Sequence, residues 1–161
     1  MAGRTRIADE PVDASGFRFA VAVSQFNEDI TLRLLDGARD CLSACKVRDE
    51  DIEVLSVPGA FELPLACKTL AEAGRFDAVV ALGCVIRGET PHFQYISTET
   101  SRGLMDAMLA TGVPIAFGVL TTDNVEQAEA RAGGGRNKGY EAARTAVDMA
   151  ALIRAVRGPR G

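Results

Sequence analysis

The pattern of apolar and polar residues divides the chain into segments, and each segment has the periodicity of either a strand or a helix. Four short runs are nearly continuously apolar or alternate with period two, as strands do: residues 17–24, 51–57, 78–86 and 114–121. Apolar residues elsewhere recur every three or four positions, which predicts helices over roughly residues 28–45, 60–73, 92–110, 125–131 and 140–156. Strands and helices therefore alternate from one end of the pattern to the other.

Capping residues mark the starts of two of these predicted helices. Asn27 stands where the first helix begins, and its short amide side chain suits an N-cap. Asp123 or Asn124 is placed to cap the fourth helix. Glu126 or Gln127, three residues later, would complete a capping box.

Strict alternation of strands and helices predicts an α/β fold with a parallel sheet and helices on both of its faces. Ligands of such sheets bind outside the carboxyl ends of the strands. The polar segments that follow the four predicted strands would meet at that rim: residues 24–27, 57–62, 87–92 and 121–124. The functional site is therefore expected there.

Length and composition predict one domain. The chain has 161 residues, of which 47% are hydrophobic, so one well-buried core over residues 16–157 is expected. Residues 1–15 are polar and are expected to form a flexible arm that orders only against a partner, and residues 158–161 form a tail.

Charge and hydropathy restrict the partners. The net charge is −4 and the basic residues are scattered, which argues against a nucleic-acid partner. No run approaches the ~18 apolar residues of a membrane-spanning helix. The N-terminal residues also lack the apolar core of a signal peptide. We therefore expect a cytoplasmic protein without a membrane partner.

The four cysteines are expected to be buried, reduced thiols rather than metal ligands. Cys41, Cys45, Cys67 and Cys84 form no C-x-x-C pair. The single histidine cannot complete a zinc site with them. Cysteines among apolar residues usually have a packing role, so no metal is expected.

His92 is the strongest candidate for chemistry. It is the only histidine and follows the apolar run 78–86 at the predicted start of a helix. A strand-to-helix junction presents unpaired N–H groups and the positive end of the helix dipole, which together bind anions. Imidazole beside an anion can transfer protons near neutral pH. For an isolated histidine, the alternative is a solvated or capping residue.

Other residues near the rim have two interpretations each. Phe26 could stack on a planar heterocycle or belong to the core. Glu62 could accept hydrogen bonds from hydroxyl groups or simply favour a helix start. Arg131, at a helix end, could clamp a phosphate, as could Lys138 in the glycine-rich loop 133–139. That loop lacks the spacing of a P-loop, so it does not indicate a nucleotide site.

Five motifs in order resemble the lumazine synthase family over residues 17–155: residues 24–27 (SQFN), 57–64 (VPGAFELP), 81–93 (ALGCVIRGETPHF), 118–121 (GVLT) and 137–139 (NKG). The resemblance implies a flavodoxin-like, three-layer α/β/α subunit with a four-stranded parallel sheet. It also implies a homo-oligomer, a pentamer or a multiple of pentamers, with sites between neighbours. The arm 1–15 is long enough to lie on a neighbour's sheet edge.

The resemblance also implies a reaction of riboflavin biosynthesis. 5-Amino-6-ribitylaminouracil would condense with 3,4-dihydroxy-2-butanone 4-phosphate to 6,7-dimethyl-8-ribityllumazine, with loss of phosphate and water and without metal or organic cofactor. Two alternatives stay open at this point. One is a paralogue such as an archaeal-type riboflavin synthase, and the other is a flavin- or lumazine-binding or shell protein with little catalysis. The set Phe26, Glu62 and His92 argues against the riboflavin synthase paralogue, whereas product-like ligands of a binding protein would fit the same stack.

By the same resemblance, one group of residues binds the pyrimidine substrate. Phe26 would stack on the ring, and the backbone around Val85 and Ile86 would read its polar edge. The ribityl chain would be held by side chains and backbone groups of four residues: Asn27, Ala60, Phe61 and Glu62.

A second group would bind the phosphate and transfer protons. The backbone of Glu89 and Thr90 would bind the phosphate together with Arg131 of the same or an adjacent chain. His92 would move protons during imine formation and phosphate loss. The neighbouring subunit would add two residues, Phe117 and Lys138.

Overall fold

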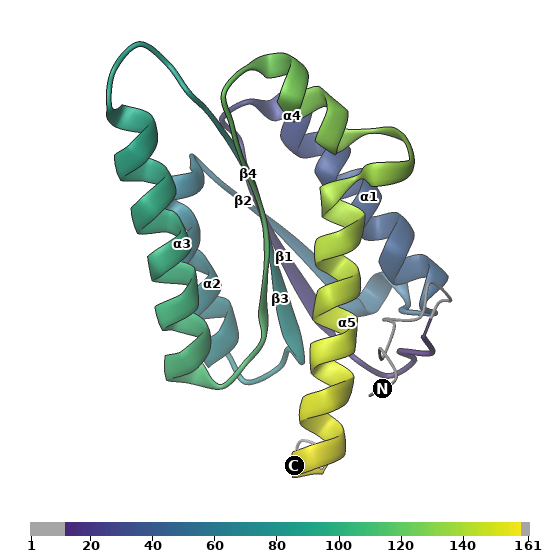
Figure 1. The fold of residues 1–161 in the computed structure, drawn as a ribbon. Helices are drawn as coiled ribbons and strands as arrows, with labels where there is room; N and C mark the ends of the chain where they lie inside the picture. The colour runs from purple at the N-terminus through teal and green to yellow at the C-terminus, as the bar shows by residue number, and fades with distance from the viewer. Residues whose placement is uncertain (1–11, 159–161) are drawn as a thin grey trace, which may run out of the picture.

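The computed structural model describes residues 12–158, which form an α/β/α sandwich around one parallel sheet (Figure 1). The strands lie in the order β2-β1-β3-β4: β1 Phe19–Ser24, β2 Ile52–Val57, β3 Ala78–Ile86 and β4 Ile115–Thr122. The helices are α1 Glu28–Ala44, α2 Leu63–Glu72, α3 His92–Thr111, α4 Val125–Ala132 and α5 Lys138–Arg157. Three short 3₁₀ helices complete the described chain: η1 Asp49–Asp51, η2 Ala60–Glu62 and η3 Gly134–Arg136.

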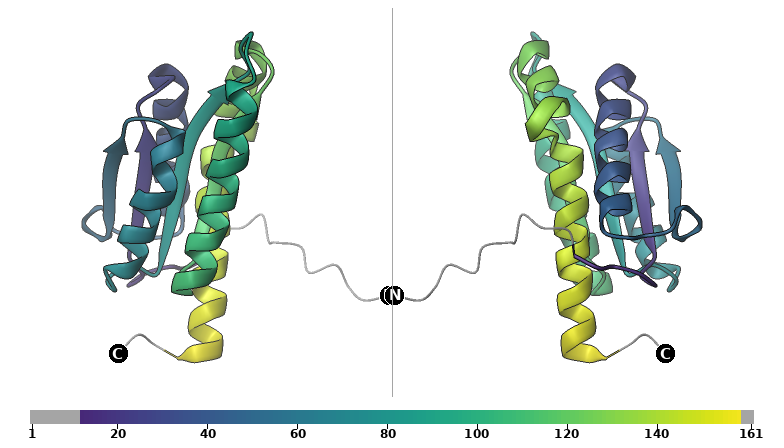
Figure 2. Two further views of the ribbon diagram at one scale, coloured as in Figure 1. Left: turned by 90° about the vertical axis from the view of Figure 1, so that its left-hand side faces the viewer. Right: turned by 90° about the vertical axis from the view of Figure 1, so that its right-hand side faces the viewer.

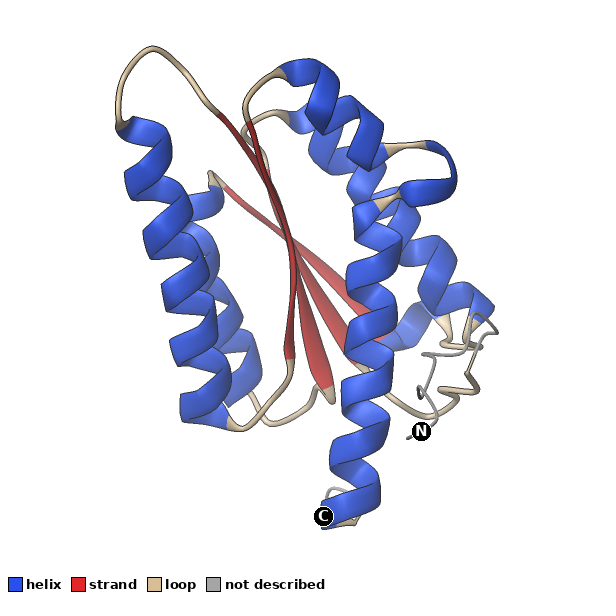
Figure 3. Ribbon diagram, in the orientation of Figure 1, coloured by secondary structure: helices blue, strands red, loops and turns tan. Residues whose placement is uncertain are grey.

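The sheet is buried between two helical layers, as predicted. Helices α2 and α3 cover one face, and α1, α4 and α5 cover the other (Figures 1 and 3). The side views look onto one helical layer at a time, with α2 and α3 in front of the sheet in the left view and α5 in front of it in the right view (Figure 2). Successive residues of β3 pack alternately into the two cores: Val80 and Leu82 toward α1 and α5, Val79 and Ala81 toward α2 and α3. The double burial explains why this strand is apolar throughout.

Most predicted elements are confirmed, with shifted ends. The first strand begins at Phe19, two residues later than predicted. The second begins at Ile52 because the residues before it form η1. The predicted helix over 60–73 is divided into η2 and α2, whose second residue is Pro64. The last helix begins at Lys138, earlier than predicted, because Asn137 caps it.

Asn124, not Asp123, caps α4. Its Oδ1 accepts a hydrogen bond from the Gln127 backbone N–H at 2.8 Å. The Gln127 Oε1 accepts in return from the Asp123 backbone N–H at 2.8 Å. These two hydrogen bonds resemble a capping box, except that the Gln127 side chain accepts from the residue before the N-cap and not from the N-cap residue itself.

The prediction that the Asn27 side chain caps α1 is wrong. Asn27 occupies the N-cap position, but in the left-handed conformation (φ 60°, ψ 48°) and without a side-chain cap bond. Its Nδ2 donates instead to the Cys84 carbonyl oxygen at 2.9 Å. The side chain therefore joins the end of β1 to the end of β3.

Residues 1–11 of the predicted arm and residues 159–161 of the predicted tail lie outside the described residues. The last part of the arm packs on its own chain: Ala14 is buried, and its backbone N–H donates to the Cys45 carbonyl at 2.8 Å. None of the helices within residues 12–158 is long and apolar enough to cross a membrane.

The four cysteines are buried and free, as predicted. Burial raises the pKa of the Cys67 thiol to about 12. Burial and, to a lesser extent, the Asp29 carboxylate raise the pKa of Cys84 to about 11. Thiols with such values stay protonated near neutral pH and are poor nucleophiles.

Candidate functional site

A cavity of about 490 Å³ opens at the carboxyl ends of the strands, and we call it the rim cavity. Its walls come from the turn after β1, the segment after β2, the end of β3 and the start of α3. The lining residues are Phe26, Asn27, Pro58, Gly59, Ala60, Phe61, Glu62, Cys84, Val85, Ile86, Gly88, Thr90, His92, Phe93 and Ile96. Three of the four predicted loops thus meet at one site.

Hydrogen bonds fix the turn that carries Phe26. The backbone N–H of Phe26 donates to the Pro58 carbonyl at 3.1 Å, which ties the turn to the segment after β2. Asn27 ties the next residue to Cys84, as described above. The Phe26 ring itself is 72% exposed at the cavity mouth. A fixed backbone with an exposed ring suits stacking on a planar ligand.

The Glu62 carboxylate lies over the backbone of Gly59. A Cβ at Gly59 would be 3.2 Å from Glu62 Oε2, so a larger residue would crowd the carboxylate. The buried Thr100 hydroxyl of α3 donates to the Ala60 carbonyl at 3.2 Å and anchors η2. Glu62 is exposed, so its oxygens are accessible to ligand hydroxyl groups.

Arg87 holds the loop between β3 and α3. Its Nε donates to Asp123 Oδ1 at 2.8 Å, and its guanidinium lies 4.4 Å from the centre of the Phe93 ring. Its backbone N–H donates to the Thr122 carbonyl at 2.8 Å. These contacts brace the loop from β4 and from α3.

The start of α3 offers a site for an anion. Pro91 is the N-cap residue and makes no side-chain cap bond to the first turn. The N–H groups of a first turn have no partner within the helix, and the dipole adds positive potential there. His92 is exposed on this turn and lines the rim cavity together with Thr90 and Gly88. A side chain that can donate or accept a proton therefore stands at the helix start, in the same cavity as Phe26.

A second cavity, of about 440 Å³, lies on the outer edge of the sheet, and we call it the edge cavity. Residues of β4, α4 and α5 line it: Phe117, Gly118, Val119, Leu120, Thr121, Thr122, Arg131, Lys138, Glu141, Ala142 and Thr145. Arg131 Nη1 donates to the Gln127 carbonyl at 3.0 Å, and Lys138 Nζ pairs with Glu141 Oε2 at 2.7 Å. Phe117 is 49% exposed on the edge strand. Two cations and an aromatic ring thus share this cavity.

The predicted site residues divide between the two cavities. Nine of them line the rim cavity: Phe26, Asn27, Ala60, Phe61, Glu62, Val85, Ile86, Thr90 and His92. Phe117, Arg131 and Lys138 line the edge cavity. Glu89 is exposed in the loop before α3 and lines neither. One subunit therefore does not bring the whole predicted set together.

Sequence reasoning missed two walls of the rim cavity, Phe93 and Ile96. Ile96 lies four residues after His92, so helical periodicity could have placed it on the same face. Phe93 is oriented by Arg87, a contact that no local pattern reveals. Within residues 12–158, no group of three or more His, Cys, Asp or Glu residues could hold a metal ion.

Comparison with known proteins identifies one family. A family model described as 6,7-dimethyl-8-ribityllumazine synthase matches residues 16–154, which include the lining residues of both cavities. A protein of Syntrophus aciditrophicus (strain SB), named 6,7-dimethyl-8-ribityllumazine synthase, is 57% identical over 144 residues. That alignment covers 89% of this chain and 94% of the relative.

Proposed function

This chain belongs to the 6,7-dimethyl-8-ribityllumazine synthase family. From that membership we propose which substrate groups each of the two cavities binds. The protein is a transferase of riboflavin biosynthesis. It condenses 5-amino-6-ribitylaminouracil with 3,4-dihydroxy-2-butanone 4-phosphate and releases phosphate and water. Both matches favour this activity over a binding or shell protein and over a riboflavin synthase paralogue.

The pyrimidine substrate occupies the rim cavity in this proposal. Its ring stacks on Phe26, whose exposed face has room for it. Its polar edge meets backbone groups of Val85 and Ile86, where β3 ends. Hydroxyls of the ribityl chain donate to the Glu62 carboxylate, and Asn27 and the backbone of η2 complete the contacts.

The sugar phosphate binds with its phosphate at the start of α3. Backbone N–H groups of Glu89 and Thr90 face the phosphate oxygens, and the helix dipole adds to the attraction. His92 then moves protons as the amine adds to the ketone, as water leaves the adduct and as phosphate is lost. Holding the amine and the ketone together supplies much of the acceleration.

The observation that carries the shared-site proposal is the charge of the rim cavity. Its lining contains one carboxylate, one imidazole and neither lysine nor arginine. A helix start carries only about half a positive charge, and a lysine or arginine beside it would strengthen the binding of a phosphate dianion. The edge cavity holds Arg131 and Lys138, together with Glu141, which pairs with Lys138. We therefore place the edge cavity of one subunit against the rim cavity of the next, in a closed homopentamer.

Subunit mixing tests this arrangement. Phe26→Ala disables the rim cavity and Arg131→Ala the edge cavity, and each pure variant should lose most of its activity. Assemblies co-folded from equal amounts of the two variants should regain activity in about a quarter of their sites, where both contributing halves are intact. The readout is the rate at which the lumazine chromophore forms.

The same experiment can refute the proposal. If each site lies within one chain, every mixed assembly has a defect in every site and no activity returns. Arg136→Ala is the matched control, because Arg136 is an exposed arginine that lines neither cavity. When Phe26→Ala is mixed with Arg136→Ala, only the rim cavities of the Arg136→Ala subunits should be active, because the Phe26→Ala subunits have no intact rim cavity.

A further inference from the structure

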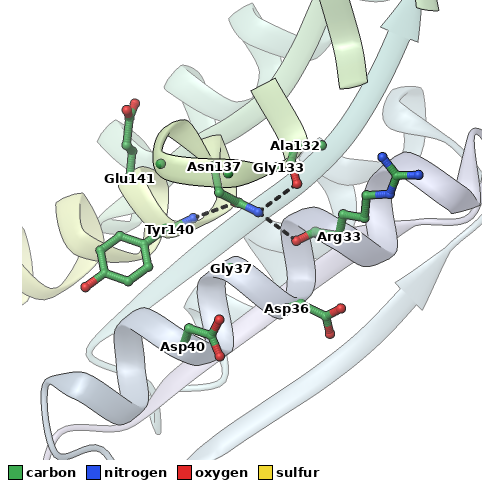
Figure 4. Close-up of a pocket in the computed structure, with 11 residues that line it drawn as sticks. Arg33, Asp36, Gly37, Asp40, Ala132, Gly133, Asn137, Tyr140 and Glu141 are labelled. Atoms are coloured by element: carbon green, nitrogen blue, oxygen red, sulfur yellow. Dashed lines mark hydrogen bonds between the residues drawn. The ribbon is translucent and has the colours of Figure 1, made fainter. Parts of the chain in front are cut away.

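The Asn137 side chain uses all four of its hydrogen-bonding positions. Figure 4 shows its bonds to Arg33, Ala132 and Tyr140. Its Oδ1 accepts from the backbone N–H groups of Gly139 and Tyr140, at 2.8 and 3.1 Å, and so caps α5. Its Nδ2 donates to the carbonyl oxygens of Arg33 and Ala132, both at 2.9 Å. One amide therefore joins the start of α5 to α1 and to the end of α4.

The surrounding backbone is shaped around this amide. A Cβ at Gly37 of α1 would lie 2.1 Å from Asn137 Oδ1, so only glycine leaves room for it. A Cβ at Gly139 of α5 would lie 1.9 Å from the Leu34 carbonyl oxygen. The two helices thus meet backbone to backbone beside Asn137. A larger side chain in place of the amide would push them apart.

The loop before Asn137 is rich in glycine and exposed. Cβ atoms at Gly134 and Gly135 would have no atom within 4 Å, and Gly134 has a φ of 61°. Arg136 is exposed. Glycine-rich backbone loses much conformational freedom when it is fixed, so it does not define a position by itself.

This loop connects the two cations of the edge cavity. Arg131 immediately precedes Ala132, whose carbonyl Asn137 binds, and Lys138 immediately follows Asn137. We propose that Asn137 is a positioning residue for phosphate binding: it fixes the backbone at both ends of the glycine loop, so that Arg131 and Lys138 meet one phosphate together. This inference rests on the proposed role of these two cations.

Two substitutions separate the capping of α5 from the cross-link. Asn137→Ser and Asn137→Asp both keep an N-cap acceptor for α5, and both lose the donations to Arg33 and Ala132. For the assembled enzyme, KM for the sugar phosphate should rise by about tenfold or more, because displacements near 1 Å can cost up to about 100-fold. KM for the pyrimidine, which binds at the other cavity, should change by less than about twofold.

Asn124→Ser is the matched control. It makes the same change at the N-cap of α4, where the side chain bonds only to its own helix start. KM for both substrates should stay near the wild-type values. Inhibition by inorganic phosphate gives a second readout. Its inhibition constant should rise together with the KM for the sugar phosphate in the two Asn137 variants, and it should not change in Asn124→Ser.

Three other outcomes would overturn the inference, and the measurements distinguish them from one another. If the folded Asn137 variants keep the wild-type KM for the sugar phosphate while Arg131→Ala raises it, Asn137 has no positioning role. Equal rises in both KM values would indicate general loosening and would also overturn it. If neither Arg131→Ala nor Lys138→Ala weakens phosphate binding, the proposed phosphate site is wrong and the role of Asn137 falls with it.

Discussion

Replacing Gly139 by alanine adds one methyl group where two helices touch. The new Cβ would lie 1.9 Å from the carbonyl oxygen, 2.6 Å from the carbonyl carbon and 2.8 Å from the Cα of Leu34. All three are backbone atoms, so no change of rotamer can relieve the overlap. The start of α5 must move away from α1.

The expected magnitude follows from opposing terms. Alanine is better than glycine in a helix by about 1 kcal/mol, so without a clash the substitution would stabilise the fold. Overpacking a tight contact costs about 1–3 kcal/mol or more. Separating the helices also stretches the bond from Asn137 to the Arg33 carbonyl, which contributes about 1 kcal/mol. We expect a net loss of roughly 1–3 kcal/mol in the free energy of unfolding.

Thermal unfolding followed by circular dichroism measures this loss. For a chain of this size, each kcal/mol lowers the melting temperature by roughly 2–4 °C. Variants must be compared at one protein concentration, because the stability of an assembly depends on it. Gly135→Ala is the control: its Cβ would meet no atom within 4 Å, so its melting temperature should stay the same or rise slightly. A Gly139→Ala protein that melts at or above the wild type would refute the reasoning.

Four further predictions concern the rim cavity and the thiols. Phe26→Ala should melt within about 1 °C of the wild type, because the ring is exposed, and should raise KM for the pyrimidine by roughly 5- to 100-fold through lost stacking; an unchanged KM would exclude the stack. His92→Ala should lower kcat by at most about 100-fold, the low end of general acid–base catalysis, and an unchanged kcat would remove His92 from the mechanism. Iodoacetamide should label Cys67 and Cys84 at pH 8 only after unfolding. Because the unfolded thiols ionise near their ordinary pKa of 9.0 and the folded ones only at about 12 and 11, stability should fall as pH rises above 9.

The sequence predicts best those elements whose bounds depend on residues close to one another in the chain. Strand β3 has the predicted bounds because it is apolar on both faces and a charged residue stands at each end, Asp77 and Arg87. Helix α3 ends where Gly112 takes the left-handed conformation that terminates helices. Asn27 was misassigned because its partner, Cys84, is 57 residues away and belongs to another strand.

The same distinction applies to the site. The alternation of strands and helices was enough to predict that loops near Phe26, Glu62 and His92 converge. The wall formed by Phe93 depends on its contact with Arg87, and the separation of Arg131 from the rim cavity depends on the complete fold. Residue patterns carry neither of these three-dimensional relations.

In the proposed ring, a rim cavity without a cation of its own would couple catalysis to assembly. A ligand that spans both cavities would bind the ring and not the separated subunit, so by linkage it would stabilise the ring, by about 2.7 kcal/mol at 100 times its Kd. The sugar phosphate would then be a substrate that also holds neighbouring subunits together. A subunit that dissociated would lose the cations of its neighbour's edge cavity, so the separated half of a site would not convert the substrate.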